Sequence, residues 1–138
     1  MKDKEKLIIG SDPDNIFTVD EWAERIAEEM GFAPDERDDI AISVTEAVNN
    51  AIVHGNGQDP TKRVFIEFVK ERNELRVSVC DEGGGFNPEC IDDPTKPENL
   101  MKPFGRGVLI IRSLMDEVDF QCLGEGMKVT LVKRRREK

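Results

Sequence analysis

Two runs of alternating apolar residues, separated by three polar ones, constrain the fold of this chain most strongly. The runs cover residues 63–70 and 74–80. Their alternating apolar positions are Val64, Ile66 and Phe68 in the first run and Leu75, Val77 and Val79 in the second. Successive side chains of a β-strand point to opposite faces of a sheet, so each run predicts a strand with one buried face. The short link between them makes an antiparallel hairpin the natural pairing.

Apolar residues at helical spacing predict two helices before the hairpin and one after it. The first covers residues 18–30 and ends at Gly31, the second begins near Pro34 and ends at the turn 54–57, and the third covers 108–115. The apolar positions are Val19, Trp22, Ile26 and Met30, then Ile40, Val44, Ala47, Val48 and Ala51, then Val108, Ile111, Leu114 and Met115. Each helix therefore has one face suited to a core.

Three further apolar runs, at residues 7–9, 118–122 and 127–132, predict the remaining strands. The resulting order, β-α-α-β-β-α-β-β, favours an α+β fold in which helices lie on one face of a mostly antiparallel sheet. A chain of 138 residues is the size of one domain, so residues 1–138 are expected to form a single unit.

Residues 86–104 break this regularity. Periodicity disappears there, and prolines recur at Pro88, Pro94, Pro97 and Pro103. A link without periodic structure that exceeds roughly 12–15 residues is often functional in a compact domain. We therefore predict a lid or a binding loop.

Charge disfavours two classes of partner. A formal net charge of -9 argues against direct binding to DNA or to an acidic membrane, because both polyanions need a basic face. The basic run Lys133-Arg134-Arg135-Arg136 is interpreted as a solvated tail that blunts the edge of the last strand.

The sequence also points to a cytoplasmic protein. No apolar stretch approaches the ~20 residues that cross a bilayer, and the N-terminal residues lack the apolar region of a secretory signal. The three cysteines, Cys80, Cys90 and Cys122, form no close pair and are expected to be reduced thiols.

Polar residues gather near the end of the second predicted helix. Glu46, Asn50 and His54 are four apart and would share one helix face beside the apolar stripe. An Asn carbonyl is a suitable ligand for Mg2+, and a carboxylate one turn away can orient a hydroxyl or a water. An ordinary polar helix side is the alternative interpretation.

Two glycine clusters carry the remaining chemistry. Asp81-Glu82-Gly83-Gly84-Gly85-Phe86 follows a strand, and its aspartate can accept a hydrogen bond from an exocyclic amine such as that of adenine. Phe104-Gly105-Arg106-Gly107-Val108 opens a helix whose free N–H groups can bind phosphate. A glycine-rich turn and a flexible link are the alternatives. No P-loop and no dinucleotide fingerprint occurs in the sequence.

In this order, the three segments resemble the N, G1 and G2 boxes of the histidine-kinase-like (GHKL) ATPase superfamily. They are particularly similar to the small anti-sigma factors that also act as serine-protein kinases. The resemblance runs from about Leu7 to Lys133. The triple glycine 83–85 departs from the family pattern at Gly84.

This resemblance implies a fold, a cofactor and a set of site residues. The fold would be the superfamily's two-layer α/β sandwich, with a mostly antiparallel mixed sheet covered on one face by helices and an ATP lid at about 86–104. ATP and Mg2+ would be bound, with Glu46 as general base, Asn50 holding Mg2+ and Asp81 reading adenine. The other expected nucleotide contacts are Asn49, Gly83, Gly85, Phe86, Gly105, Arg106, Gly107, Val108 and Thr130.

The resemblance also implies a function in regulation. Such proteins phosphorylate a serine of an anti-anti-sigma (STAS-type) partner and sequester a sigma factor, and homodimerisation is expected from resemblance alone. The alternative is a nucleotide-gated binding module that transfers no phosphate. An α/β interaction domain with chance motifs would bind no ATP.

Overall fold

The computed structural model describes residues 3–83, 105–123 and 126–136. Its strands form one sheet in the order β1-β2-β3-β5-β4. The strands are β1 (Asp3–Gly10), β2 (Arg63–Lys70), β3 (Glu74–Asp81), β4 (Glu117–Leu123) and β5 (Gly126–Arg134). The helices are α1 (Ile16–Glu29), α2 (Pro34–Asn50) and α4 (Gly105–Leu114), with a short 3-10 turn at Pro13–Asn15 and a π-helical turn, η2, at Ala51–Gly55.

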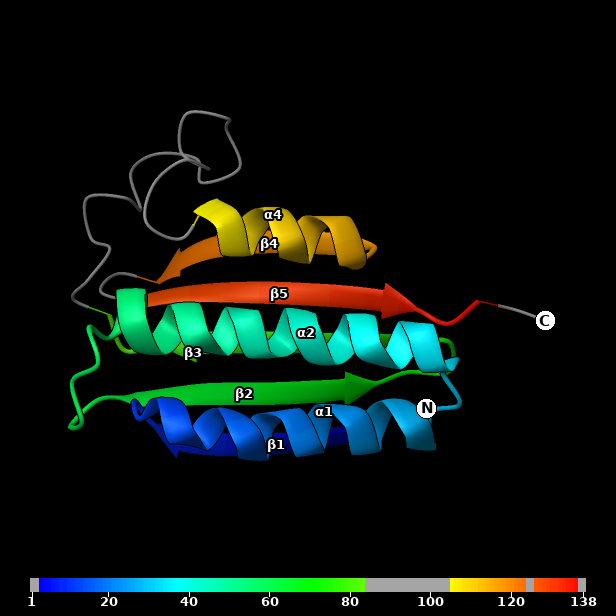
Figure 1. The fold of residues 1–138 in the computed structure, drawn as a ribbon, viewed down its shortest axis with the longest axis horizontal. Coiled ribbons are helices and arrows are strands. Elements are labelled where there is room, and N and C mark those ends of the chain that lie inside the picture. Colours follow the sequence, from blue (N-terminus) through cyan, green and yellow to red (C-terminus); the bar gives the residue numbers. More distant parts are fainter. Residues whose placement is uncertain (1–2, 84–104, 124–125, 137–138) are drawn as a thin grey trace.

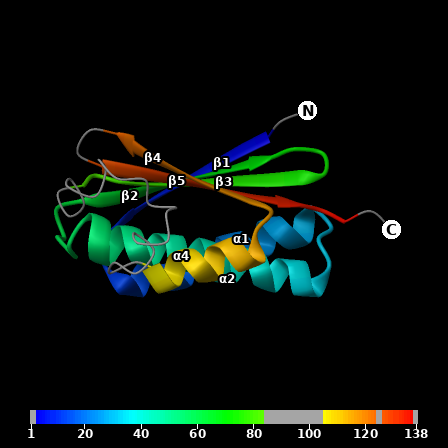
Figure 2. The same ribbon diagram turned by 90° about the horizontal axis from the view of Figure 1, so that it is seen from above.

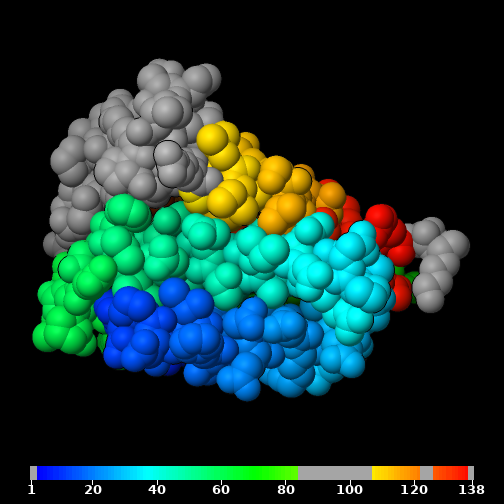
Figure 3. All heavy atoms as spheres, in the orientation of Figure 1, coloured from blue at the N-terminus to red at the C-terminus, as the bar shows by residue number. Residues whose placement is uncertain are grey.

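The sheet and the helices form two layers. Figure 2 shows α1, α2 and α4 on one face of the sheet, and Figure 3 shows their side chains lying next to one another across that face. All four strand pairings in the described residues are antiparallel. The expected α+β sandwich is confirmed, although the described sheet is antiparallel throughout where a mixed sheet was expected.

The hydrophobic core lies between these two layers. Phe68 of β2 is fully buried, and its ring stacks on that of Trp22 in α1 with a centroid separation of 6.3 Å. The alternating residues Val64, Ile66, Leu75, Val77 and Val79 are all buried as the hairpin pattern predicts. Ile40, Val44 and Val48 of α2 complete the middle of the core, so α2 is fixed directly over β3 and β5.

Local residue chemistry sets the ends of the helices. Gly31 adopts a φ of 83° after α1, a conformation that favours glycine, and Pro34 occupies the first turn of α2. The Ala33 backbone N–H, which precedes α2, donates to Glu36 Oε1 at 3.0 Å. The predicted boundaries of α1 and the predicted start of α2 are therefore confirmed to within two residues.

The end of α2 differs from the prediction. After Asn50 the helix widens into the π-helical turn η2, and the Asn56 N–H donates to the Ala51 carbonyl at 2.8 Å. A π turn adds a residue to the hydrogen-bonded ring, which changes the angular spacing of the side chains. The prediction that His54 shares one face with Glu46 and Asn50 therefore stays a prediction.

Strand β1 is longer than the predicted run 7–9 and spans eight residues. It is an edge strand, and its residues 3–6 are all charged. Charged side chains on an edge strand oppose pairing with other chains. Residues 3–6 therefore lack the apolar alternation that would have predicted a strand, although they pair with β2.

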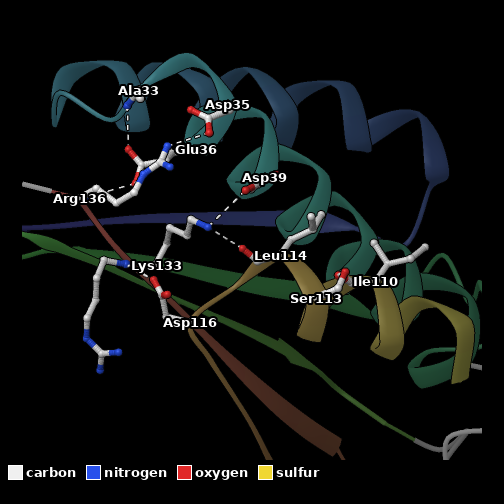
Figure 4. A network of polar contacts seen from close by, with 11 residues as sticks. Ala33, Asp35, Glu36, Asp39, Ile110, Ser113, Leu114, Asp116, Lys133 and Arg136 are labelled. Carbon is white, nitrogen blue, oxygen red and sulfur yellow. Dashed lines mark hydrogen bonds and ion pairs between the residues drawn. The ribbon is translucent and has the colours of Figure 1, made fainter.

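The basic run 133–136 is not a free solvated tail, because its first two residues belong to β5 and its members contact α2 and α4 (Figure 4). Lys133 Nζ donates to the Leu114 carbonyl at 2.6 Å and lies 3.3 Å from Asp39 Oδ2. Arg136 Nε donates to Glu36 Oε2 at 3.1 Å. The prediction is corrected because the carboxylates of α2 and the C-terminal carbonyl of α4 provide partners for these cations.

The helices of the described residues include none with the length and apolar character needed to cross a membrane. The predicted lid at 86–104 lies outside the described residues.

Candidate functional site

A pocket opens between the helices and the sheet at the end of the core where η2, β3 and β5 meet. Its lining is mostly apolar, with two polar side chains, Asn50 and Asp81. The apolar lining comes from Ala47, Ala51, Val79, Ile111, Phe120, Met127 and Val129. An apolar pocket with one carboxylate and one amide suits an aromatic ligand that carries a polar edge.

Asp81 is the last residue of β3 and is held from three sides. The Met127 N–H donates to Asp81 Oδ1 at 3.2 Å. A methyl group added at Gly55 would overlap the Asp81 carboxyl group, and one added at Gly126 would overlap the Asp81 backbone carbonyl. Neither glycine has a positive φ. Space beside Asp81, rather than backbone conformation, therefore requires glycine at both positions.

The environment of Asp81 changes its acidity. Burial raises the pKa of Asp81 to about 6, while the N–H groups of Met127 and Gly83 and the charge of Lys62 act in the opposite direction. A carboxylate in this setting accepts a hydrogen bond from a ligand amine most effectively above that pH.

Glu46 and Asn50 face the first turn of α4. A methyl group added at Gly107 would lie 2.8 Å from Glu46 Oε2 and 2.8 Å from Asn50 Nδ2. A larger residue at this position would have to displace these two side chains, so glycine lets the N-terminal turn of α4 lie against them. The free N–H groups of that turn and the two polar side chains of α2 therefore border one space, and Asn50 connects it with the pocket of Asp81.

Asn56 and Lys62 hold the segment that follows Asp81. Asn56 Oδ1 accepts hydrogen bonds from the N–H groups of Glu82 at 2.8 Å and Gly83 at 3.1 Å. Lys62 Nζ donates to the Gly83 carbonyl. Gly83 itself has a φ of 84°, as the prediction for a glycine-rich turn requires.

Thr130 is not part of this site. Its neighbours Val129 and Leu131 are buried in the core beneath the helices. Because side chains alternate along a strand, Thr130 lies on the opposite face of the sheet, with Arg76 and Asp119. The residues of β5 that reach the pocket are Met127 and Val129, so the prediction for Thr130 is corrected.

The remaining predicted site residues lie outside the pocket lining or outside the described residues. Asn49 lies on α2 but does not line the pocket, and Val108 is fully buried in the first turn of α4. Gly105 begins α4, as predicted. Gly85 and Phe86 lie outside the described residues, as does the side chain of Arg106.

Four residues that matter to this geometry were not predicted: Gly55, Asn56, Gly126 and Met127. The glycine and asparagine of the sequence 54–57 were interpreted as turn residues only. In the structure the positive φ values of that turn belong to Gly57 and Gln58, so the turn conformation does not require glycine at position 55. A second glycine in the same turn therefore indicates a close approach of another group.

Comparison with known proteins gives a consistent result. The model of the histidine kinase-like ATPase domain matches residues 9–133. The anti-sigma F factor of Anoxybacillus flavithermus is 38% identical over 104 residues, which are 72% of this chain and 70% of that protein. The serine-protein kinase RsbW of Bacillus licheniformis is 32% identical over 117 residues, 78% of this chain and 71% of that protein.

Solved structures resemble the fold. The RsbU and RsbW domains of a Mycobacterium tuberculosis protein match with a TM-score of 0.69 and 20% identity, over 97% of this chain and 33% of that one. A histidine kinase domain from Erythrobacter litoralis matches with a TM-score of 0.57 and 19% identity, over 92% of this chain and 62% of that one.

Proposed function

The chain belongs to the histidine kinase-like ATPase domain family, and we propose that it binds ATP in the pocket of Asp81 and phosphorylates a serine of a regulatory partner. The observation that carries this proposal is the placement of Asn50. It lines the pocket together with Asp81 and also borders the first turn of α4 at Gly107. A base-binding pocket and an anion-binding helix N-terminus are thereby joined through one side chain.

Adenine is the ligand group that suits Asp81, because its edge carries an exocyclic amine. The ionised carboxylate would accept a hydrogen bond from the exocyclic amine, and the apolar walls would enclose the ring. The N–H of Met127 and the close approach of Gly55 fix the carboxylate before a ligand arrives. This preorganisation favours binding because little side-chain freedom is lost.

The phosphates would lie at the first turn of α4. Gly105 and Gly107 permit close approach to the free N–H groups of that turn, where the helix dipole also favours an anion. Arg106 would add a cation to this region, as the family resemblance implies.

The residues beside α4 fit a magnesium ion. Mg2+ typically takes one or two protein oxygen ligands and completes its shell with waters and phosphate oxygens. Asn50 offers an amide oxygen beside Gly107, and no cluster of three or more His, Cys, Asp or Glu residues competes within the described ranges. When bound, Mg2+ would neutralise and orient the phosphates.

Glu46 would act on the phosphate acceptor. Its carboxylate lies one helical turn before Asn50 and borders Gly107. In that position it would accept the proton of an incoming serine hydroxyl, while α4 holds the phosphates. The chain's main contribution to phosphoryl transfer would be positioning and electrostatic stabilisation.

The name of one relative, anti-sigma F factor, supports a sigma factor as a partner, and the family resemblance implies the other partner. We propose an anti-anti-sigma (STAS-type) protein, whose serine accepts the phosphoryl group of ATP, and a sigma factor as the second partner. Direct DNA binding is not proposed, because the net charge is -9. Homodimerisation and a cytoplasmic location stay predictions.

The test is incubation of the chain with γ-labelled ATP and a candidate anti-anti-sigma protein. We expect label on a serine of the partner. Glu46→Gln should keep ATP binding and reduce the rate of transfer at least tenfold, since the substitution removes the proton acceptor without changing shape. ATP-dependent binding of the partner without label would instead support a nucleotide-gated binding module. Equal transfer rates for the wild type and Glu46→Gln would refute the role of Glu46.

A further inference from the structure

Asn56 is a buried polar residue with an unusually complete set of partners. Its side chain is 3% exposed, although asparagine is mostly a surface residue. The amide nitrogen Nδ2 donates to Ser11 Oγ at 3.0 Å and to the Arg63 carbonyl at 3.0 Å. The amide oxygen Oδ1 accepts from the N–H groups of Glu82 and Gly83. All four hydrogen-bonding positions of the amide are therefore used.

The two ends of this amide contact different parts of the molecule. Nδ2 faces the scaffold, where Ser11 Oγ in turn donates to the Lys62 carbonyl at 2.8 Å and Arg63 begins β2. Oδ1 faces the segment that leaves β3 directly after Asp81. The side chain thus joins a fixed part of the sheet to the start of the glycine cluster.

The backbone of Asn56 does not explain the choice of residue. Its φ of -96° and ψ of -5° are open to most residues, and the positive φ values of the turn belong to Gly57 and Gln58. A buried amide is costly unless its partners are complete. The side-chain contacts to Glu82 and Gly83 therefore account for asparagine at this position.

We infer that Asn56 is a positioning residue for the nucleotide site: it fixes the backbone of Glu82 and Gly83 so that the segment after Asp81 is ordered before ATP binds. This inference rests on the proposed ATP-binding function. Lys62 supports the same segment through the Gly83 carbonyl. Gly83 is thereby held at both its N–H and its carbonyl by residues from the turn between η2 and β2.

Calorimetric titration with ATP of the wild type and two Asn56 variants tests this inference. Asn56→Ala removes all four hydrogen bonds of the amide and should weaken ATP binding roughly tenfold, the effect expected from losing the two that hold Glu82 and Gly83. Asn56→Asp keeps an oxygen for Glu82 and Gly83 but loses both donations to the scaffold. It should lower the unfolding temperature while restoring ATP affinity to within about threefold of wild type.

The matched control is Asn73→Ala. Asn73 is an exposed asparagine at the link between β2 and β3, and its side chain accepts a hydrogen bond from Arg135 at 2.9 Å. Its loss should leave ATP affinity unchanged. Equal affinity for wild type and folded Asn56→Ala, or equal losses for the Ala and Asp variants, would overturn the inference. A wild type that binds no ATP would refute the proposed function itself.

Hydrogen exchange provides a second test that does not depend on the folding of a variant. In the wild type without nucleotide, the amides of Glu82 and Gly83 should exchange more slowly, by about tenfold or more, than those of the exposed residues Gly57 and Arg72. Exchange of the Glu82 and Gly83 amides at the rate of the Gly57 and Arg72 amides would show that Asn56 does not order the segment, and the inference would fail.

Discussion

At the scale of single residues, Asp81 combines two requirements that oppose each other. Its carboxylate must be ionised to accept a ligand hydrogen bond, yet its position at the end of β3 removes much of its hydration. Burial raises the pKa of Asp81 to about 6, even though the Met127 N–H donates to it. Stability and ligand binding should therefore depend on pH in opposite directions.

The first prediction concerns this pH dependence. Between about pH 4 and pH 6 the folded chain holds a proton on Asp81 that the unfolded chain has released, so the free energy of unfolding falls as pH rises through this window. ATP affinity should rise through the same window as Asp81 ionises. Urea unfolding and ATP titration at pH 5 and pH 7 measure both quantities.

Asp81→Asn provides the control for pH, because an amide does not titrate in this range. Its free energy of unfolding should lack the Asp81 contribution to the pH dependence. Identical pH profiles of wild type and Asp81→Asn would contradict the proposed acidity of this group.

The second prediction concerns Gly55. In Gly55→Ala the added methyl group meets the Asp81 carboxyl group, so either the carboxylate or η2 must move. We expect a loss of about 1–3 kcal/mol in the free energy of unfolding and ATP affinity reduced by roughly tenfold or more. Denaturant unfolding and calorimetry measure the two effects.

Gly57→Ala is the matched control for Gly55→Ala. A methyl group at Gly57 meets nothing within 4 Å, but the φ of 61° is unfavourable for alanine. Stability should fall by about 1 kcal/mol, while ATP affinity should not change. A similar loss of affinity in both variants would show that contact with Asp81 is not the cause.

Site residues differ in how far their chemistry could be predicted from sequence. Gly83 and Gly107 stand in segments whose residue types already suggest turns and anion binding. Asn56 contacts Glu82, which is 26 positions away, and Met127 contacts Asp81, which is 46 positions away. Thr130 was assigned to the wrong face because the assignment followed a family pattern rather than the alternation of β5.

At the scale of elements, α2 and α4 border the proposed phosphate side of the site, and their spacing is set at both ends. Near the pocket, Gly107 allows close approach to Glu46 and Asn50. At the far end, Lys133 joins the last carbonyl of α4 to Asp39 of α2 (Figure 4). The side chain of Lys133 is 13% exposed, so these contacts are largely shielded from water.

The third prediction concerns this connection. Lys133→Met should keep the apolar stem of the side chain and lose its hydrogen bond to Leu114 and its ion pair with Asp39. We expect a loss of about 1–3 kcal/mol in the free energy of unfolding, measured by urea denaturation. Lys6→Met is the matched control. Lys6 lies 3.8 Å from Glu67 with its side chain 73% exposed, and the loss there should be about 0.5 kcal/mol or less.

Helices and strands were predicted well from sequence where one face of the element is buried and the other is exposed. The hairpin 63–80 and the stripe of α2 follow from the contrast between core and solvent, which repeats along the chain. The N-terminal half of β1 lacks this contrast because it lies at the edge of the sheet. The π-helical turn also escaped prediction, since apolar spacing does not distinguish it from one more turn of α-helix.

At the scale of the whole molecule, one layer of helices lies on one sheet, and the site forms where the ends of η2, β3, β5 and α4 meet (Figure 1). The three segments that suggested a nucleotide site are 46–55, 81–86 and 104–108. Folding brings the described parts of all three to this place. The order of the segments could be predicted from sequence, but the distances between them depend on the packing of α2 against β3 and α4.

The central claim is that Asp81 anchors ATP in this pocket, and calorimetric titration of wild type and Asp81→Asn with ATP and Mg2+ tests it most directly. We predict one ATP site in the wild type at pH 7. Asp81→Asn should bind roughly ten- to hundred-fold more weakly, because a charge-assisted hydrogen bond worth about 1.5–3 kcal/mol is lost. Equal affinity in the two proteins, or no binding by the wild type, would contradict the claim.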